Sequence, residues 1–355
     1  MTVADPTAPV RSGERFDVSN LAKFMRGKLP GLMELVEIRQ FPGGHSNLTY
    51  LVKSGGHEWV VRRPPVGSKV ASAHDMGREY RVLSRLHRVF PKAPEPLVFC
   101  DDPSIIGTPF YMMKPIYGTV YRAKKPDDFS LTAHRVRDAC YEFVETLAAL
   151  HCINYRAAGL EELYKGPGYL ERQLGGWEKR WADARTEDVP EMDRVLPWLK
   201  RHKPATDFGA AIIHNDFKFD NLVYDAENGK KLIGVLDWEM ATVGDPLSDF
   251  AVTLTTWIEK KDELQTSVSA CFMGQQTGGL TREELINIYA RRTGFDVDDL
   301  LWYYVLALYK GAVIIQQIYY RYHHGLTKDE RFARMADVTK ALARRAAAAV
   351  DSETI

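Results

Sequence analysis

The fold is decided by the stretch 213–222, Ile-His-Asn-Asp-Phe-Lys-Phe-Asp-Asn-Leu, and by its echo at 234–239, Gly-Val-Leu-Asp-Trp-Glu. The apolar run before His214 predicts a short strand that ends in a polar loop. Residues 221–224 alternate as a second strand, and residues 232–236 form a third. Both quoted stretches therefore place polar side chains where strands end.

The second and third strands are joined by a turn that contains Asn-Gly at 228–229. This pair favours a two-residue type I′ hairpin, which would put Asn221 opposite Leu236. A register shifted by one residue would still leave Asn221 and Asp237 at the same open end of the hairpin. Because Asp216 lies in the loop that leads into it, three oxygen-bearing side chains are predicted to converge.

These three side chains suit phosphoryl transfer from a nucleotide. A carboxylate and an amide oxygen side by side, those of Asp237 and Asn221, suit Mg²⁺, which keeps water and substrate phosphates as its other ligands. Asp216 can accept the proton of an attacking hydroxyl. The order and spacing of the three residues are typical of a kinase catalytic loop followed by its metal-binding aspartate.

Two other interpretations of the loop are open. A solvated polar loop beside a surface hairpin would use the same residue types. A hydrolase metal site could use His214 with Asp216 and Asp220, but no second histidine cluster accompanies them in the sequence. The order, the spacing and the strand context together favour the kinase interpretation.

The two quoted stretches resemble the catalytic core of the aminoglycoside phosphotransferase and choline kinase superfamily, which has a protein-kinase-like fold. The resemblance spans about residues 30–325. Within the superfamily, the chain looks most like the phosphotransferase domain fused to some eukaryotic acyl-CoA dehydrogenases and its free-standing bacterial relatives. The resemblance implies ATP and Mg²⁺ as cofactors and a small-molecule hydroxyl as acceptor. It also implies that Lys218, two positions after Asp216, reaches the γ-phosphate.

The implied fold class is α+β, with two lobes. The N-terminal lobe, residues 1–113, is expected to hold a five-stranded antiparallel sheet and the nucleotide-phosphate loop. The C-terminal lobe, residues 114–355, is expected to be mainly helical and to hold the catalytic loop, the metal site and a helical insert that shapes the acceptor site. A chain of 355 residues is long enough for both lobes.

Composition argues against several classes of partner. The 47 basic and 47 acidic residues cancel, so no basic surface for nucleic acid or anionic membranes is expected. The four cysteines lack metal-ligand spacing and predict reduced thiols in a cytoplasmic protein. The N-terminus lacks the apolar core of a signal peptide. The apolar run 300–320 is interrupted by Lys310, Gln316 and Gln317, which predicts a buried helix rather than a membrane span.

A glycine turn at 42–47 joins strands predicted at 34–41 and 48–53. Glycine lets backbone N–H groups approach phosphate oxygens closely, although a plain hairpin would look the same. The resemblance assigns the Gly-Gly-x-Ser-Asn sequence of this turn to a phosphate loop. The residues implied to bind the nucleotide phosphates are Gly43, Gly44, Ser46 and Asn47.

The third strand, predicted to end at Arg62, offers a cation for the same phosphates. In kinases a lysine two positions after a small buried residue holds the α- and β-phosphates. Val60 and Arg62 share a strand face, so Arg62 occupies that position, with Arg63 as the neighbouring alternative. A helix predicted at 69–90 places Glu79 where it can pair with the strand cation. A solvated charge is the other interpretation for both residues.

The last two strands of the sheet are predicted at 97–100 and 110–113. The sequence Lys-Pro-Ile-Tyr-Gly at 114–118 breaks the strand pattern and resembles the hinge between kinase lobes. The backbone groups implied to bind the adenine edge are those of Met112, Met113 and Lys114.

Long helices dominate the rest of the chain. A helix at 132–149 ends near His151, which we interpret as structural. Asp245 is expected to cap the next helix, and Asp249 to bond back to the catalytic loop. Asn215 stands where protein kinases carry an arginine that docks a phosphorylated loop, so phosphorylation-switched activity and protein substrates are not expected.

The predicted helices at 169–184 and 191–202 are rich in Trp and Arg and fall where relatives carry the acceptor-site insert. Their cationic and aromatic side chains suit an anionic, partly apolar acceptor, with a hydroxyacyl-CoA as the leading hypothesis. An ordinary amphipathic pair of helices would look the same. An aminoglycoside or choline-type kinase and a catalytically inactive nucleotide-binding module are the alternatives. The residues on which the acceptor hypothesis rests are Arg172, Trp177, Arg180, Trp181 and Arg185.

Overall fold

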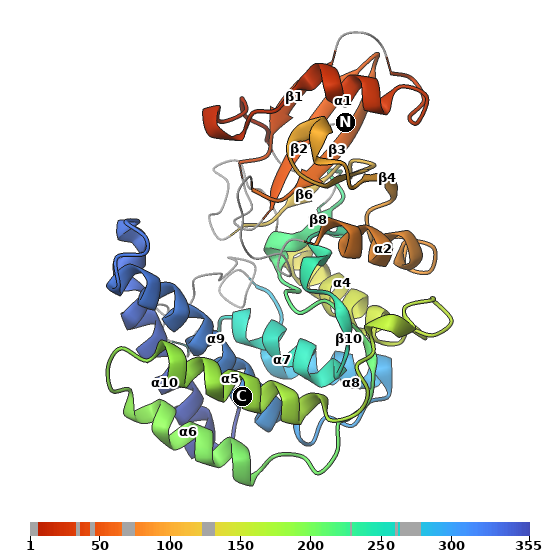
Figure 1. The fold of residues 1–355 in the computed structure, drawn as a ribbon. Coiled ribbons are helices and arrows are strands. Elements are labelled where there is room, and N and C mark those ends of the chain that lie inside the picture. Colours follow the sequence, from red (N-terminus) through yellow and green to blue (C-terminus); the bar gives the residue numbers. More distant parts are fainter. Residues whose placement is uncertain are drawn as a thin grey trace. The chain divides into compact units, whose positions relative to one another are not determined.

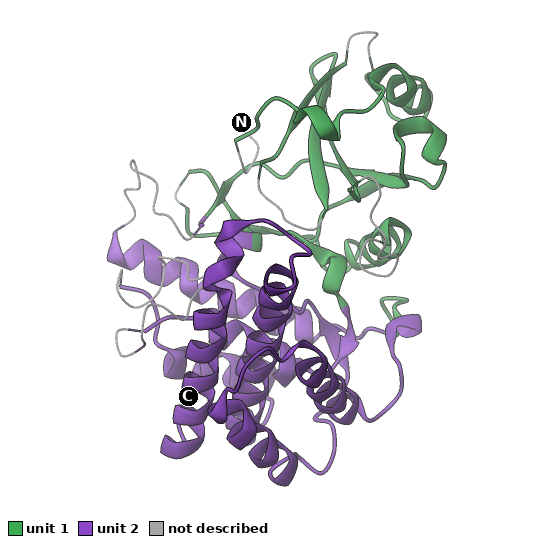
Figure 2. Ribbon diagram, turned by 60° about the vertical axis from the view of Figure 1, so that its left-hand side comes forward, with its two compact units in different colours: residues 1–120, 156–160, 221–241 green, residues 121–155, 161–220, 242–355 purple. Residues whose placement is uncertain are grey.

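The computed structural model describes residues 6–32, 36–42, 47–65, 75–122, 132–227, 229–259, 262 and 278–355. These residues form two compact units, shown in different colours in Figure 2. Unit 1 comprises residues 1–120, 156–160 and 221–241, and unit 2 comprises residues 121–155, 161–220 and 242–355. Some predicted features lie outside the described residues: Gly43, Gly44 and Ser46 of the phosphate loop, the first residues of the helix at 69–90, and Asn228 of the hairpin turn.

Unit 1 is built on a five-stranded antiparallel sheet with the strand order β1-β2-β3-β5-β4 (Figure 1). The sheet confirms the prediction, and the predicted bounds of β2, β4 and β5 lie within one residue of those observed. The strands are β1 (Glu37–Gln40), β2 (Leu48–Ser54), β3 (His57–Arg63), β4 (Pro96–Cys100) and β5 (Phe110–Met113).

The β2–β3 connection is a tight turn at Gly55-Gly56. Both glycines have positive φ, 57° and 79°, which is the backbone of a type I′ turn. This turn fixes the register so that Thr49 pairs with Arg62 and Leu48 with Arg63. Since side chains alternate along a strand, the register sends Arg62 and Arg63 to opposite faces of the sheet.

One face of this sheet carries the hydrophobic core of unit 1. Tyr50, Val61 and Phe110 are fully buried there with Leu21 and Met25 of α1 (Val18–Met25). Burying side chains of this kind contributes about 1.5–3 kcal/mol each. The other unit 1 helices are α2 (Met76–Leu86) and α3 (Pro103–Ile106), and α2 contacts β4 and β5.

Helix α2 is shorter than the predicted helix 69–90. It begins at Met76 because the carboxylate of Asp75 accepts the Arg78 N–H at 2.8 Å and so caps the first turn. It ends at Leu86, after which the chain forms a turn rather than continuing to Phe90.

Unit 1 also contains a three-stranded sheet, β6-β8-β9, made of β6 (Thr119–Val120), β8 (Leu222–Tyr224) and β9 (Leu232–Val235). The pairs Leu222↔Val235 and Val223↔Gly234 have the predicted register, and a shift follows at Tyr224↔Leu232. The expected alternation along β8 is wrong, because all three of its residues are buried. Both edges of this strand pair with a neighbour, and the burial of all three side chains means that both of its faces are covered as well.

Unit 2 is mainly helical, as predicted. A two-stranded sheet, β7 (Ala211–Ile213) with β10 (Thr242–Gly244), carries the catalytic loop at the end of β7. The helices are α4 (Ala133–His151), α5 (Tyr169–Ala184), α6 (Pro190–Arg201), α7 (Pro246–Thr256), α8 (Arg282–Thr293), α9 (Leu300–His323) and α10 (Met335–Ser352). Helix α9 packs against α5, α6, α7 and α10 (Figure 1). Among the described residues, no helix is both long enough and apolar enough to cross a bilayer.

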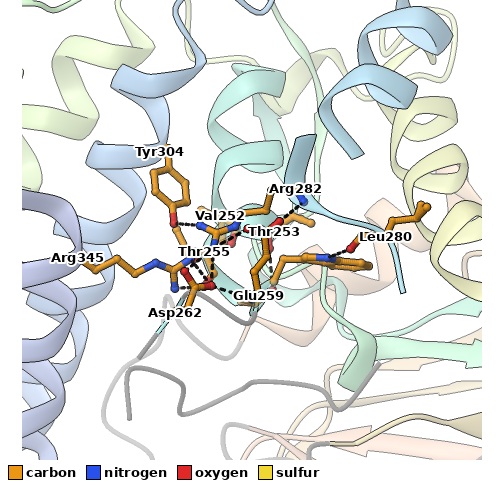
Figure 3. A network of polar contacts seen from close by, with 11 residues as sticks. Val252, Thr253, Thr255, Glu259, Asp262, Leu280, Arg282, Tyr304 and Arg345 are labelled. Atoms are coloured by element: carbon orange, nitrogen blue, oxygen red, sulfur yellow. Dashed lines mark hydrogen bonds and ion pairs between the residues drawn. The ribbon is translucent and has the colours of Figure 1, made fainter. Parts of the chain in front are cut away.

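A buried polar network ties the helices of unit 2 together (Figure 3). Arg282, at the start of α8, forms ion pairs with Glu259 and Asp262 and donates to the Tyr304 hydroxyl of α9 at 2.8 Å. Arg345 of α10 donates to the Thr255 carbonyl at 3.0 Å. Because the network is buried and charged, its breakage would leave charge without compensation in the interior.

Candidate active site

The catalytic loop of unit 2 is held by one buried carboxylate. The backbone N–H groups of His214 and Asn215 both donate to Asp249 of α7, each at 2.7 Å. Asn215 has a positive φ of 67°, a conformation that these two bonds stabilise. The expectation that Asp249 bonds back to the loop is confirmed by this geometry.

His151 supports Asp249 from behind. Its Nε2 lies 3.2 Å from Asp249 Oδ2, and its Nδ1 lies 2.6 Å from the hydroxyl of Tyr289. Burial alone would raise the pKa of Asp249, but the hydrogen bonds and charge of His151, with the neighbouring His214, hold that pKa below its usual value. His151 is fully buried and acts through Asp249, which agrees with the structural role predicted for it.

Replacement of this anchor is expected to damage both stability and turnover. The two backbone N–H groups donate to different oxygens of Asp249, so in Asp249→Asn one of them faces the NH₂ group, which is a donor. We expect a loss of about 2–4 kcal/mol in the free energy of unfolding, measured in urea. A fall of at least about tenfold in kcat should accompany it, because the loop is misplaced. The exposed Asp183→Asn on α5 is the control; equal effects of the two variants would contradict the assignment.

Asp216 and Lys218 lie together on the surface of this loop. Lys218 Nζ is 3.0 Å from Asp216 Oδ1, and the two side chains are 23% and 36% exposed, respectively. The Asp216 N–H donates to Nδ1 of buried His214 at 3.3 Å. A partly exposed carboxylate beside an ammonium is open to a substrate hydroxyl, as a general base must be.

Arg62 is the centre of the polar cluster of unit 1. Its Nε donates to Glu79 Oε2 at 3.1 Å, and its Nη2 bonds to Asp237 Oδ1 and, at 3.2 Å, to Glu239 Oε2. The predicted partners Arg62 and Glu79 therefore meet. Asn47 joins the cluster by donating to Glu239 Oε2 at 2.6 Å.

Charge in this cluster is unbalanced, because three carboxylates surround one guanidinium. Burial would lower the pKa of Arg62, but Glu79, Asp237 and Glu239 raise that pKa well above its usual value. Burial raises the pKa of the Glu79 carboxyl, and Arg62 opposes that rise. Arg62 is thus a fixed cation that phosphate groups can share with the carboxylates.

Glu239 was not assigned a role from the sequence. It stands two positions after Asp237 in the quoted Asp-Trp-Glu, and that short spacing is the signal that could have identified it. Its contact with Asn47 joins residues 192 positions apart, which local patterns do not reveal.

Arg63 is excluded as the alternative cation of the cluster. It is fully buried on the other face of the sheet, where its Nη1 donates to the Ile106 carbonyl at 3.0 Å and its Nη2 to that of Glu14 at 2.6 Å. It also lies over the Phe16 ring, 4.9 Å from the centroid. These contacts give Arg63 a structural role.

Mutation of Arg63 is expected to affect folding stability, whereas mutation of Arg62 is expected to affect ATP binding. Arg63→Ala is expected to cost about 3 kcal/mol of folding stability and to leave ATP affinity unchanged, because it removes buried charge-assisted hydrogen bonds. Arg62→Ala is expected to weaken ATP binding about tenfold or more at any Mg²⁺ concentration, with part of the loss recovered in Arg62→Lys. Urea denaturation and calorimetric titration of each variant would check both; a larger effect of Arg63→Ala on ATP would contradict the assignment.

Asn221 and Asp237, the predicted metal ligands, lie at the same end of the β8–β9 hairpin. The Leu236 N–H donates to the Asn221 carbonyl at 2.7 Å, which fixes the neighbouring Asp237 beside it. Asp237 has a positive φ of 66° and precedes Trp238, whose indole N–H donates to the Val235 carbonyl at 2.7 Å. The strand end is thus rigidly placed.

The donor set fits Mg²⁺, because a carboxylate and an amide oxygen are both hard ligands. Within the described ranges, no group of three His, Cys, Asp or Glu side chains could hold a metal alone. Phosphate and water oxygens would therefore have to complete the coordination shell. Oδ1 of Asp237 is bonded to Arg62, so a metal ion on that oxygen would have to share it with Arg62 or displace Arg62.

The predicted hinge residues are partly engaged within unit 1. Met112 and Met113 belong to β5 and pair with strands on both sides. The Lys114 N–H donates to the Glu95 carbonyl at 2.9 Å, and the Lys114 ammonium lies 2.8 Å from the Glu95 carboxylate. In this conformation Lys114 can offer an adenine edge its carbonyl group and not its N–H.

The helical insert differs from the predicted cationic and aromatic surface. Arg185 is paired with Asp188 and Asp193, at 2.6 and 3.1 Å, so its charge is already neutralised. Arg172 donates to backbone carbonyls at the start of α5. Trp181 is buried in the core and offers no face to a ligand. The other tryptophan, Trp177, is partly exposed, and the Cζ atom of Arg180 lies 4.7 Å from its ring centroid.

Residues 37–272 match the model of the phosphotransferase enzyme family. Acyl-CoA dehydrogenase family member 11 of Gallus gallus is 34% identical over 354 residues, which cover 97% of this chain and 45% of that relative. The chain therefore spans less than half the length of this relative.

Solved structures show the same architecture. A Ralstonia eutropha protein described as a candidate aminoglycoside phosphotransferase superposes with a TM-score of 0.81 at 28% identity, covering 95% of this chain and 99% of that one. Choline kinase from Cryptosporidium parvum superposes with a TM-score of 0.62 at 15% identity, covering 95% and 97%. These likenesses show that the fold is kinase-like.

Proposed function

Because the chain belongs to the phosphotransferase enzyme family, we propose that it transfers the γ-phosphoryl group of ATP to a hydroxyl of a small molecule. The observation that carries the proposal is the pair Asp216 and Lys218 on a loop anchored by Asp249. Asn221 follows on the same chain, and Asp237 lies beside it on the hairpin. Each of these residue types has a place in phosphoryl transfer.

In the proposed reaction, the acceptor oxygen forms a bond to the γ-phosphorus as the bond to the β-phosphate oxygen breaks and ADP leaves. Asp216 takes the proton of the acceptor hydroxyl, and Lys218 balances the charge beside it. Arg62 binds phosphate oxygens, held in position by Glu79. Asn221 and Asp237 would hold Mg²⁺, which would neutralise phosphate charge when bound. Positioning and charge neutralisation provide most of the rate.

We further propose a hydroxylated acyl compound, with a hydroxyacyl-CoA as the leading candidate, as the acceptor. The support is the similarity along 97% of the chain to a relative named as an acyl-CoA dehydrogenase family member. Arg185 is engaged in ion pairs and Trp181 is buried, so neither supports the acceptor hypothesis. Fewer residues of the insert are therefore available to the acceptor than the sequence suggested. We place the reaction in the cytoplasm, because the cysteines are scattered along the sequence and the described ones form no disulfide.

A screen for acceptor-dependent ADP formation tests the proposal. Hydroxyacyl-CoAs, choline, amino sugars and aminoglycosides would each be offered with ATP and Mg²⁺, and products identified by mass spectrometry. Efficient turnover of choline or kanamycin-like polyamines without turnover of hydroxyacyl-CoAs would overturn the acceptor class and leave the kinase chemistry standing. If no acceptor is used, slow ATP hydrolysis by the wild type and not by Asp216→Ala would still separate an enzyme from an inactive nucleotide-binding module.

A further inference from the structure

A small cavity of about 20 Å³ lies beside the catalytic loop within unit 2. It has room for about one water molecule or one oxygen atom. Asn215 of the loop lines it, together with residues of α5, α7 and α9. Part of its wall is apolar, formed by Val252, Leu306 and Ala307. A cavity of this size beside the loop that carries Asp216 is too small for a sugar ring and suits a single functional group.

Lys310 brings a cation to this cavity from the middle of α9. Within the described ranges its ammonium makes no hydrogen bond or ion pair. The ring of Trp177 lies near it, with the ring centroid 5.6 Å from Nζ. Burial lowers the pKa of Lys310, while the carboxylates of Asp249 and Asp216 oppose that effect and Arg180 adds to it. A lysine in such a place costs stability that a methionine would not.

Ser248 of α7 lines the same cavity and carries an unsatisfied hydroxyl. Its Oγ is buried and has no hydrogen-bond partner in the part of the chain that the structure describes. A buried hydroxyl without a partner lowers the stability of the folded protein. Two donors that lack an acceptor, one of them cationic, therefore line one small space.

We propose that this cavity is the subsite for the carbonyl oxygen of the acceptor, which Lys310 and Ser248 bind by hydrogen bonds. The assignment rests on the proposed function, because the cavity gains its meaning from Asp216 next to Asn215. A charge-assisted bond from the ammonium and a second bond from the hydroxyl match a carboxylate, ester or thioester oxygen. The acceptor is then a hydroxy acid or a hydroxyacyl compound.

The same cation works against other acceptors. An ammonium at this position repels quaternary ammonium groups and polyamines that would enter the subsite. Choline and aminoglycosides carry such groups and offer no carbonyl oxygen for the two donors. The subsite therefore gives a physical reason for selectivity that does not depend on the arginines of the insert.

Three matched probes test the subsite: 4-hydroxypentanoate, its methyl ester and 1,4-pentanediol. The wild type is expected to phosphorylate at least one of the first two with a kcat/KM about 10- to 100-fold above that of the diol, which lacks the carbonyl oxygen. Turnover of the acid alone identifies a free carboxylate as the bound group; turnover of the ester identifies an acyl carbonyl. A diol used as well as both others would overturn the proposal.

Lys310→Met is expected to abolish the preference for carbonyl compounds and to leave the KM for ATP within about twofold. Ser248→Ala, which is smaller and apolar, should reduce the preference in part. Lys179→Met, an exposed lysine on α5, is the control and should behave as the wild type. Thermal unfolding of each variant checks that it is folded. A Lys310→Met enzyme that keeps the full preference would overturn the proposal, whatever Ser248→Ala shows.

Calorimetric binding of the same probes, without ATP, separates this inference from the proposed function. Binding of 4-hydroxypentanoate or its ester that is lost in Lys310→Met supports the subsite even if no phosphoryl transfer is detected, in which case the proposed function fails alone. Phosphoryl transfer that does not depend on Lys310 would support the proposed function and overturn the subsite. Absence of both binding and carbonyl preference in the wild type overturns the subsite.

Discussion

Asp216→Asn is expected to reduce kcat by about three to four orders of magnitude while MgATP affinity stays within a few-fold of the wild type. The substitution keeps the size and shape of the side chain but removes the base, and positioned general bases contribute about 10²- to 10⁴-fold. It also removes the negative partner of Lys218, which lies 3.0 Å away. Steady-state kinetics with the best acceptor from the screen, and titration with a non-hydrolysable ATP analogue, would measure the two quantities.

The control for this result is Asp183→Asn, because Asp183 is exposed on α5 and far along the chain from the loop. It should leave both kcat and nucleotide affinity unchanged. If the folded Asp216→Asn protein loses MgATP binding instead, Asp216 is a metal ligand and its role as base is misassigned.

Asp237→Ala should remove the part of ATP binding that depends on Mg²⁺. Glu239, two positions along the chain, is already bonded to Arg62 and Asn47 and is therefore a poor replacement. We expect the gain in affinity on adding Mg²⁺ to fall by about a hundredfold, which corresponds to about 2.7 kcal/mol. In EDTA the variant should bind ATP at least as well as the wild type, because Arg62 has lost a competing carboxylate.

Glu239→Gln is the matched comparison for this variant. It alters the same arginine cluster without touching the predicted metal ligands, so Mg²⁺ dependence should survive. If Glu239→Gln loses the Mg²⁺ dependence and Asp237→Ala keeps it, the metal ligand is Glu239. Calorimetry with and without Mg²⁺ distinguishes the two outcomes.

The sequence predicted those parts of the fold that local chemistry determines. The cap Asp245 acts over a few residues, and the structure places it as expected. The register at the start of the β8–β9 hairpin was also predicted, from the Asn-Gly pair at 228–229.

Features that depend on tertiary packing were not predictable in the same way. Trp177 and Trp181 share a helix face, yet packing buries Trp181 and leaves Trp177 partly exposed. Arg185 was predicted to bind phosphate, but it forms an ion pair with Asp193 of α6, which the sequence does not place beside it. In the sequence Lys310 only interrupts an apolar run, because the residues of α5 and α7 that line the cavity with it are distant along the chain.

In the proposed nucleotide complex, the ion pair between Arg62 and Asp237 would couple phosphate binding to metal binding. Phosphate on Arg62 would leave Asp237 to the metal ion, and a metal ion on Asp237 would leave Arg62 to the phosphates. Each ligand thus removes a competitor of the other, so ATP and Mg²⁺ should bind with positive cooperativity. By thermodynamic reciprocity, the factor by which Mg²⁺ tightens ATP binding equals the factor by which ATP tightens Mg²⁺ binding. An enzyme with this arrangement responds to the concentration of the MgATP complex rather than to that of either component alone.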